Sequence, residues 1–173
     1  KAWFRVPETI QVRLEGTPAI GVTPRDVAQH VVGFMGEDSA IYQALEYAGS
    51  FIEDLSIEDR CLFPLMSIDL GAKAAYINPD DKTVAFARTH SSTKEFDMMR
   101  NDTGIAYAKI VPIDVGSIDG PQVACPPTVG NVKPVGDVAG IPVDIAEIGG
   151  STGGRLTDIR TLVEHLNGRP AHP

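Results

Sequence analysis

The sequence predicts an α/β fold, in which mixed or parallel sheet layers are flanked by helices. Apolar runs bounded by turn residues alternate with segments of helical spacing along almost the whole chain, and this alternation is typical of the α/β class. The composition agrees, because 43% hydrophobic and 22% charged residues are ordinary values for a globular domain. A length of 173 residues suits one domain, or one domain and part of a second.

The first half of the chain supplies a strand, a helix and a second strand. Residues 4–16 (FRVPETIQVRLEG) alternate apolar and polar side chains after the proline and predict a strand. Residues 23–36 predict a helix with Thr23 as N-cap, Pro24 in the first position and Gly36 as its end. A strand-like run, IYQALEYAG, follows at 41–49.

Residues 56–72 predict a helix that is interrupted. Ser56 and Asp59 have the spacing of a capping box, and the apolar residues after them repeat with helical spacing. Pro64 inside this segment predicts a kink or a break.

The second half continues the alternation and contains two stretches rich in glycine. We expect a short buried strand at 73–79, one or two helical turns at 80–88, a strand at 108–119, a long Pro/Gly loop at 121–140, a strand running into Ile148, a Gly-rich loop at 149–155 and a final helix that ends at Gly168.

Charge and apolar patterning exclude two classes of function. The net charge is −8 with scattered basic residues, whereas binding to nucleic acid needs a concentrated basic face. No apolar run is long enough for a membrane span, and no signal-peptide pattern opens the chain.

Cys61 and Cys125 lack C-x-x-C spacing, so we expect buried thiols and a cytoplasmic protein. A chain that begins at Lys1 suggests a piece of something longer.

The glycine loop GGSTGGR at 149–155 allows two interpretations on its own residues. Unpaired N–H groups at a helix start suit a carboxylate or a phosphate, and Ser151, Thr152 and Arg155 would add donors. The loop does not match the glycine spacing of the nucleotide-binding motifs. A plain tight turn with a solvated arginine explains the same residues.

Three collinear stretches bear a wider resemblance. They are similar to segments of the aconitase and 3-isopropylmalate dehydratase large-subunit family. The first stretch is residues 4–36, and the second is residues 45–83, which include LSIEDRCLFPLMSIDLGA. The third runs from VACPPTVGNVKPV at 123–135 to EIGGSTGGRLTDIRTLVEHLNGR at 147–169. The match implies the middle of such a subunit. Residues 1–120 then correspond to an aconitase-like α/β domain, and residues 121–173 to a loop and the start of a following α/β domain with the cluster-loop strand and helix.

The resemblance also assigns positions to the chemistry. The family's GSCTNGR supplies the first of three cysteine ligands of a [4Fe-4S] cluster, and Ser151 and Gly153 stand here where that motif has cysteine and asparagine. Serine is a poor iron ligand, so we expect the cluster to be absent and a divalent metal or a protonated side chain to take its role. The family's CNMSIE corresponds to Pro64, Leu65 and, at its glutamate, Asp69. Asp69 is the candidate catalytic residue.

Two functions are therefore expected. The first is a hydro-lyase or isomerase acting on a hydroxylated di- or tricarboxylate, active only together with the remaining large-subunit domains and a small swivelling subunit as other chains. The second is a non-catalytic subunit that keeps the scaffold and a carboxylate site at Ser151, Thr152 and Arg155. A phosphate site in an unrelated α/β protein is a third possibility. The resemblance implies a hetero-oligomer in the first two cases.

Overall fold

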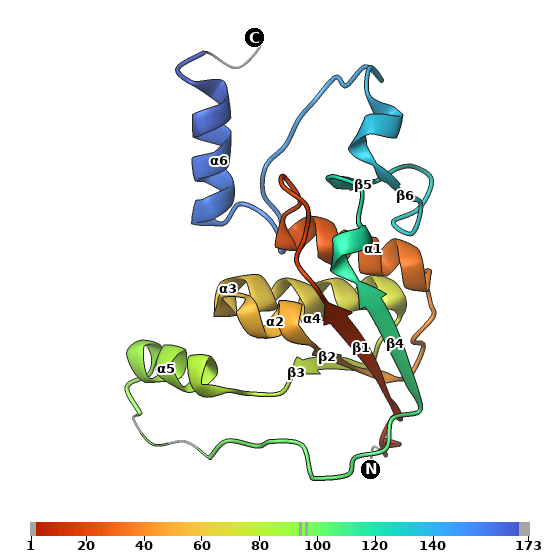
Figure 1. Ribbon diagram of the computed structural model, residues 1–173, viewed down its shortest axis with the longest axis vertical. Helices are drawn as coiled ribbons and strands as arrows, with labels where there is room; N and C mark the ends of the chain where they lie inside the picture. Colours follow the sequence, from red (N-terminus) through yellow and green to blue (C-terminus); the bar gives the residue numbers. More distant parts are fainter. Residues whose placement is uncertain (1–2, 94, 96, 170–173) are drawn as a thin grey trace. The chain divides into compact units, whose positions relative to one another are not determined.

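The computed structural model describes residues 3–93, 95 and 97–169, and the chain forms two compact units (Figure 1). The first unit runs from Lys1 to Ala139 and the second from Gly140 to Pro173. Each unit is described by itself below. The domain boundary near residue 120 stays a prediction from the sequence.

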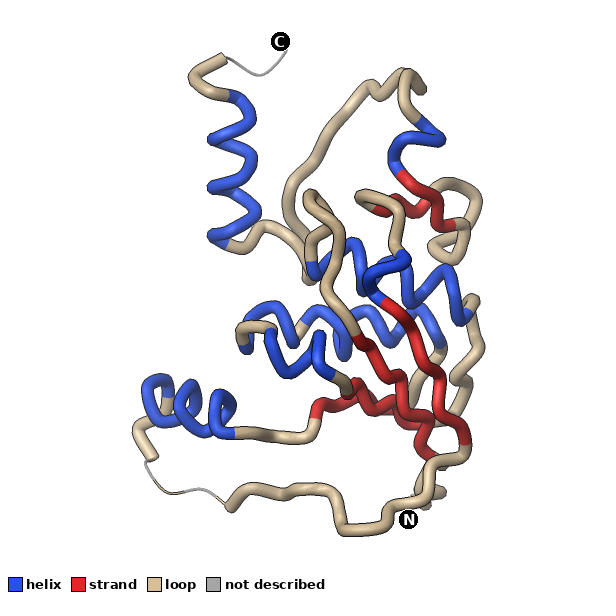
Figure 2. Tube along the Cα trace, viewed as in Figure 1, coloured by secondary structure: helices blue, strands red, loops and turns tan. Residues whose placement is uncertain are grey.

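A four-stranded sheet forms the centre of the first unit (Figure 2). Every pair of neighbouring strands is parallel, and the strand order is β3-β2-β1-β4. The α/β prediction is therefore confirmed, in its parallel form. The strands are β1 (Thr9–Glu15), β2 (Ala44–Ala48), β3 (Ala74–Ile77) and β4 (Lys109–Asp114).

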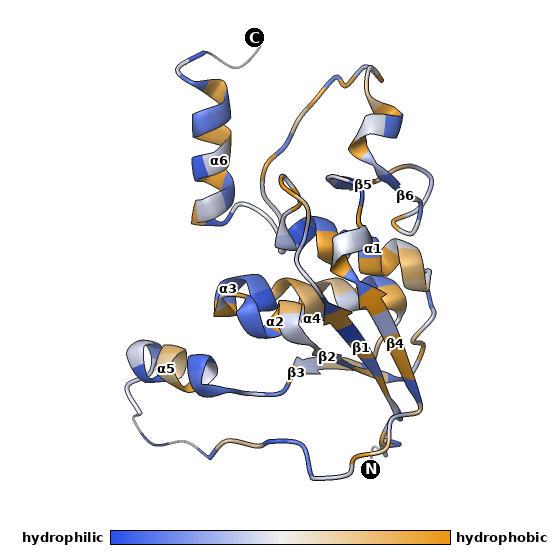
Figure 3. Ribbon diagram, in the orientation of Figure 1, coloured by the Kyte–Doolittle hydropathy of each residue, from blue (hydrophilic) through white to orange (hydrophobic). Residues whose placement is uncertain are grey.

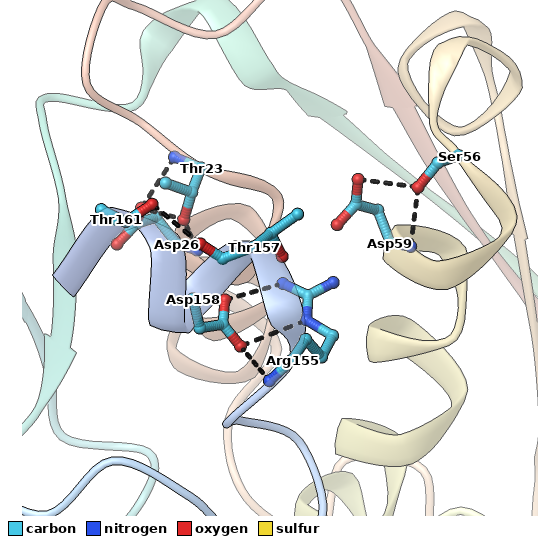
Figure 4. Close-up of polar contacts among 8 residues, drawn as sticks. All are labelled: Thr23, Asp26, Ser56, Asp59, Arg155, Thr157, Asp158 and Thr161. Carbon is cyan, nitrogen blue, oxygen red and sulfur yellow. Dashed lines mark hydrogen bonds and ion pairs between the residues drawn. The ribbon is translucent and has the colours of Figure 1, made fainter. Parts of the chain in front are cut away.

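Helix α1 (Pro24–Met35) connects β1 to β2 and packs its apolar side against the core (Figure 3). Thr23 caps the helix, with its side chain accepting from the Asp26 backbone N–H and its own N–H donating to the Asp26 carboxylate (Figure 4). The predicted cap, first-turn proline and glycine end are all confirmed. The core beneath this helix is made of Val12, Leu14, Val27, Val31, Val32, Leu45, Phe63 and Leu70.

The interrupted helix at 56–72 becomes three short segments, α3 (Ile57–Arg60), α4 (Leu62–Met66) and the 3₁₀ helix η1 (Ser67–Leu70). They follow α2 (Ser50–Asp54). The break lies at Cys61, three residues before Pro64. Proline has no N–H and its ring collides with the carbonyl four residues back, so a continuous helix cannot pass this point and the predicted break is confirmed.

Strand β3 lies at one edge of the sheet and is only partly buried. The prediction of a buried strand there was wrong, because β3 is an edge strand and pairs with β2 along one of its two long edges only. Helix α5 (Asp81–His90) follows, capped by the Asp80 carboxylate, and confirms the predicted helical turns.

Strand β4 forms the opposite edge and pairs with β1 from Ile10↔Lys109 to Glu15↔Asp114. Pro112 lies inside this strand. A short 3₁₀ helix, η2 (Val115–Ser117), ends the strand.

The Pro/Gly stretch at 121–140 is more ordered than a loop. It contains an antiparallel pair, β5 (Gln122–Ala124) and β6 (Val132–Pro134), and the 3₁₀ helix η3 (Val135–Val138). The pair is fixed to α1, since the Gln122 backbone N–H donates to Asp26 over 2.8 Å. Strands of only three residues are too short to be predicted from an alternation of apolar and polar residues.

The second unit has one helix, α6 (Leu156–Leu166), in its described residues. The expected strand into Ile148 is absent from residues 140–155, so this prediction was wrong while the helix is confirmed. Apolar alternation predicts a strand only where a partner strand is available, and the described part of the unit offers none. None of the helices in the described part of the chain is both long and apolar enough to cross a membrane.

Candidate functional site

Asp69 lies in η1, at the end of the broken helical segment. The turn is fixed from inside the fold, because the Ser67 hydroxyl donates to the Phe63 carbonyl over 2.8 Å and lies 2.8 Å from the buried Tyr47 hydroxyl. The Ala40 N–H donates to the Leu70 carbonyl over 2.8 Å and ties the turn to the loop after α1. Asp69 is thus presented, half-buried, on a rigid support.

The environment of Asp69 favours its protonated form. Burial raises the pKa of the Asp69 carboxyl, and the negative charge of Glu37 raises it further. Glu37 itself stays ionised more readily, since the Gly130 N–H, 2.7 Å away, and the Thr128 hydroxyl lower its pKa. Two carboxylates whose pKa values are pushed apart form a common acid/base arrangement. No pattern in the sequence would have predicted that Glu37 acts electrostatically on Asp69.

Leu65, one turn before Asp69, and Ile68, directly before it, are both apolar. Leu65 exposes 47% of its surface and Ile68 exposes 78%. The amide that the family motif has at position 65 would offer two donors and an acceptor, whereas leucine offers none. Neither side chain can donate a hydrogen bond to a ligand or accept one from it.

In the second unit, the loop at 149–155 leads directly into α6. Gly150 has φ +86°, which a residue with a side chain rarely adopts. Ser151 is exposed and Thr152 is half-buried. Both hydroxyls lie in the loop that precedes the first turn of the helix.

Arg155 is paired with an acid of its own helix (Figure 4). Its backbone N–H donates to Asp158 Oδ2 over 2.9 Å, and its guanidinium lies 3.3 Å from both oxygens of that carboxylate. The pair caps the helix start. It also puts the Asp158 carboxylate in the first turn of α6, where it offsets part of the pull of the helix N-terminus on a further anion.

The donor at residue 151 differs from the donors that hold an iron–sulfur cluster. Thiolates hold such clusters, and the loop presents the Ser151 hydroxyl in the corresponding place. Cys125 is half-buried, and Cys61 is exposed, which corrects the expectation of a buried thiol there. Within residues 3–93, 95 and 97–169, no three His, Cys, Asp or Glu side chains gather as metal ligands would.

Comparison with known proteins decides the family. The model of the aconitase family (aconitate hydratase) matches residues 1–142. The chain belongs to the aconitase family. This aconitase-family chain is also similar to 3-isopropylmalate dehydratase large subunits: 36% identical over 173 residues to that of Elusimicrobium minutum, and 38% identical over 172 residues to large subunit 1 of Methanopyrus kandleri.

These alignments cover 100% and 99% of the aconitase-family chain, but only 41% of each relative. The chain thus spans about two fifths of the length of the curated relatives that it matches. Asp69 belongs to the first unit, and Ser151, Thr152 and Arg155 belong to the second.

Proposed function

We propose that this chain is part of a hydro-lyase or isomerase of the aconitase superfamily, acting on a hydroxylated di- or tricarboxylate. The observation that carries the proposal is Asp69, a half-buried acid on a rigid turn with a raised pKa. The similarity to 3-isopropylmalate dehydratase large subunits supports the substrate class.

In this proposal Asp69 acts as a general acid. Dehydration of a hydroxy acid breaks a C–O bond, and the departing hydroxyl needs a proton to leave as water. A carboxyl with a raised pKa retains that proton closer to neutral pH than an ordinary aspartic acid. The proton on the neighbouring carbon is removed by a residue of the remaining domains.

Ser151 and Thr152 are assigned to a carboxylate of the substrate. Their hydroxyls and the loop's N–H groups are donors near a helix start, where negative charge is favoured. Arg155 is assigned a weaker part, because Asp158 already neutralises it. The loop then holds an anion in the position where relatives with the family motif hold their cluster cysteine.

We propose that the protein works without a [4Fe-4S] cluster bound at this loop. Serine at position 151 supports this, since an uncharged hydroxyl is a far weaker iron ligand than a thiolate. A divalent metal bound through oxygen ligands is the alternative source of Lewis acidity.

The partners that we propose are the remaining large-subunit domains and a small swivelling subunit. The relatives are named large subunits and are more than twice the length of this chain, which supports a heteromeric assembly. Exposed apolar side chains on α6, Leu156 and Val163 among them, also fit an assembly in which other parts cover this helix.

A non-catalytic, carboxylate-binding subunit is the second candidate. The apolar Leu65 beside Asp69 favours it, because the family's amide at this position is lost. Both candidates bind a carboxylate, and only the first turns it over.

The test uses the complete protein together with a small-subunit partner, assayed for formation of the unsaturated acid from 3-isopropylmalate and related hydroxy acids. We expect Asp69→Asn to lower kcat by about 10²–10⁴-fold with little change in KM. Asp54→Asn, which changes an exposed acid at the end of α2, is the control and should stay within about two-fold. Substrate binding by calorimetry without any turnover in the unaltered protein would select the second candidate.

A further inference from the structure

The carboxylate of Glu46 in β2 is only 3% exposed and accepts four hydrogen bonds. It points away from the core, since its neighbours Leu45 and Tyr47 face the core and side chains alternate along a strand. Oε1 accepts from Gln11 Nε2 over 3.1 Å. Oε2 accepts from Tyr76 over 3.0 Å, from Asn101 over 2.6 Å and from Tyr107 over 2.9 Å.

Two of these donors belong to residues 101–108, here called the strap, which lies in the long connection between α5 and β4 (Figure 2). Residues 102–106 of the strap are exposed, and only its two Glu46-binding residues are half-buried. Two backbone N–H groups also attach it: the Asn101 N–H donates to Asn78 Oδ1 over 3.0 Å and the Ala108 N–H to the Thr9 carbonyl over 2.9 Å. The strap is therefore held by polar contacts and buries little apolar surface.

The donors around Glu46 keep their protons over the ordinary pH range. Burial and the contact with Glu46 raise the pKa of Tyr76 to about 12, and they also raise the pKa of Tyr107. A buried carboxylate that is held by such neutral donors depends on them for its stability.

We propose that the strap is a hinged cover on the face of the sheet that points away from the core. The Glu46 carboxylate is the latch that holds this cover closed. The strap opens as a unit when the latch is broken, while the sheet stays folded. Opening uncovers Glu46 and Asn78, two of the residues that line a cavity of about 360 Å³ at the carboxyl ends of β2 and β3. The cover therefore controls two hydrogen-bond acceptors at that cavity.

Glu46→Gln removes the latch with almost no change in shape. If the new amide nitrogen takes the place of Oε2, it faces three donors. If it takes the place of Oε1, it faces the Gln11 amide nitrogen. Gln11 cannot turn over without loss, because its oxygen already accepts from Arg13 Nε over 3.1 Å and Nη2 over 2.7 Å. Either orientation leaves donors unsatisfied.

Hydrogen–deuterium exchange, followed by mass spectrometry on the protein, tests the latch. We expect Glu46→Gln to accelerate exchange in peptides covering 101–108 about ten-fold or more, while β1 stays protected. Tyr107→Phe removes one strap donor and should act in the same direction, so it carries the test if the first variant does not fold. Tyr76→Phe is the matched control, since it removes a donor to the same oxygen from β3 and not from the strap.

Two results would overturn the proposal. One is strap exchange that is unchanged in both Glu46→Gln and Tyr107→Phe. The other is acceleration of the strap and β1 in equal proportion, which would mean that Glu46 holds the whole fold and not the cover. Faster tryptic cleavage after Arg100, next to the strap, is expected as a second measure in the latch variants.

Discussion

Arg60 is a buried cation that joins the helical layer to the loop after β3. Its side chain is 4% exposed, and its guanidinium donates to the carbonyls of Ile52 (3.0 Å) and Glu53 (2.9 Å) and to Asp80 Oδ2 (2.7 Å). Asp80 in turn caps α5 through Thr83. One side chain thereby fixes the ends of two helices, although the sequence presents it as an ordinary helix-face arginine.

We predict that Arg60→Met lowers the free energy of unfolding by about 3 kcal/mol, measured by urea denaturation. The loss is at the lower end for a buried pair, because the Asp80 side chain is 37% exposed and regains water. The control is the exposed Arg5→Met, which should stay within about 0.5 kcal/mol. Equal stability of the two variants would contradict this account.

The same pair gives stability a pH dependence. The hydrogen bond from Arg60 lowers the pKa of Asp80, so the contribution is fully present above the unfolded value of about 4 and is lost as pH falls below it. The unfolding free energy of Arg60→Met should therefore decline less than that of the unaltered protein between about pH 5 and pH 2. A parallel decline in both would rule out this linkage.

At the scale of elements, the turn from β2 into α2 depends on Gly49. This residue has φ +105°, and a Cβ atom there would lie 2.2 Å from the Leu14 carbonyl oxygen of β1. The backbone at Gly49 passes so close to the backbone of β1 that no side chain fits between them. This close approach allows α2 to begin immediately after β2.

Gly49→Ala should therefore destabilise the protein by about 3 kcal/mol, the sum of backbone strain and overpacking. Thermal unfolding measures the effect. Gly136→Ala is the matched control, since nothing lies within 4 Å of its Cβ position. If both variants unfold at the same temperature, the close approach is not a real constraint.

At the scale of the whole molecule, the sequence was informative wherever local chemistry decides structure. Thr23, Pro24 and Gly36 set the ends of α1, and Pro64 set the break before α4. These signals act within a few residues and need no tertiary partner.

Prediction failed where the outcome depends on distant partners. The apolar run into Ile148 has strand periodicity but forms no strand in the described residues. The Glu46 cluster joins residues up to 61 positions apart, and Glu37 acts on Asp69 from another element. Asp69 came from the family resemblance, whereas Ser151 came both from the resemblance and from the residues of the glycine loop, and the roles of both are proposals.

The assembled protein should contain no [4Fe-4S] cluster that depends on residue 151. A serine at a helix start offers a neutral hydroxyl, whereas a cysteine there would be stabilised as a thiolate. Iron and sulfide are measured after anaerobic purification, and Ser151→Ala should leave both unchanged. A brown protein with near-equal iron and sulfide, both lost in Ser151→Ala, would refute the prediction.

Pro112 in β4 affects how copies of the chain behave toward one another. Its nitrogen carries no hydrogen, and prolines inside strands are confined to sheet edges for that reason. An open edge normally offers a regular row of donors on which another chain's strand can align. Pro112 can add no donor to such a row on β4, so we expect a second molecule to form fewer hydrogen bonds if it extends the sheet there. This edge is thereby a poor template for aggregation.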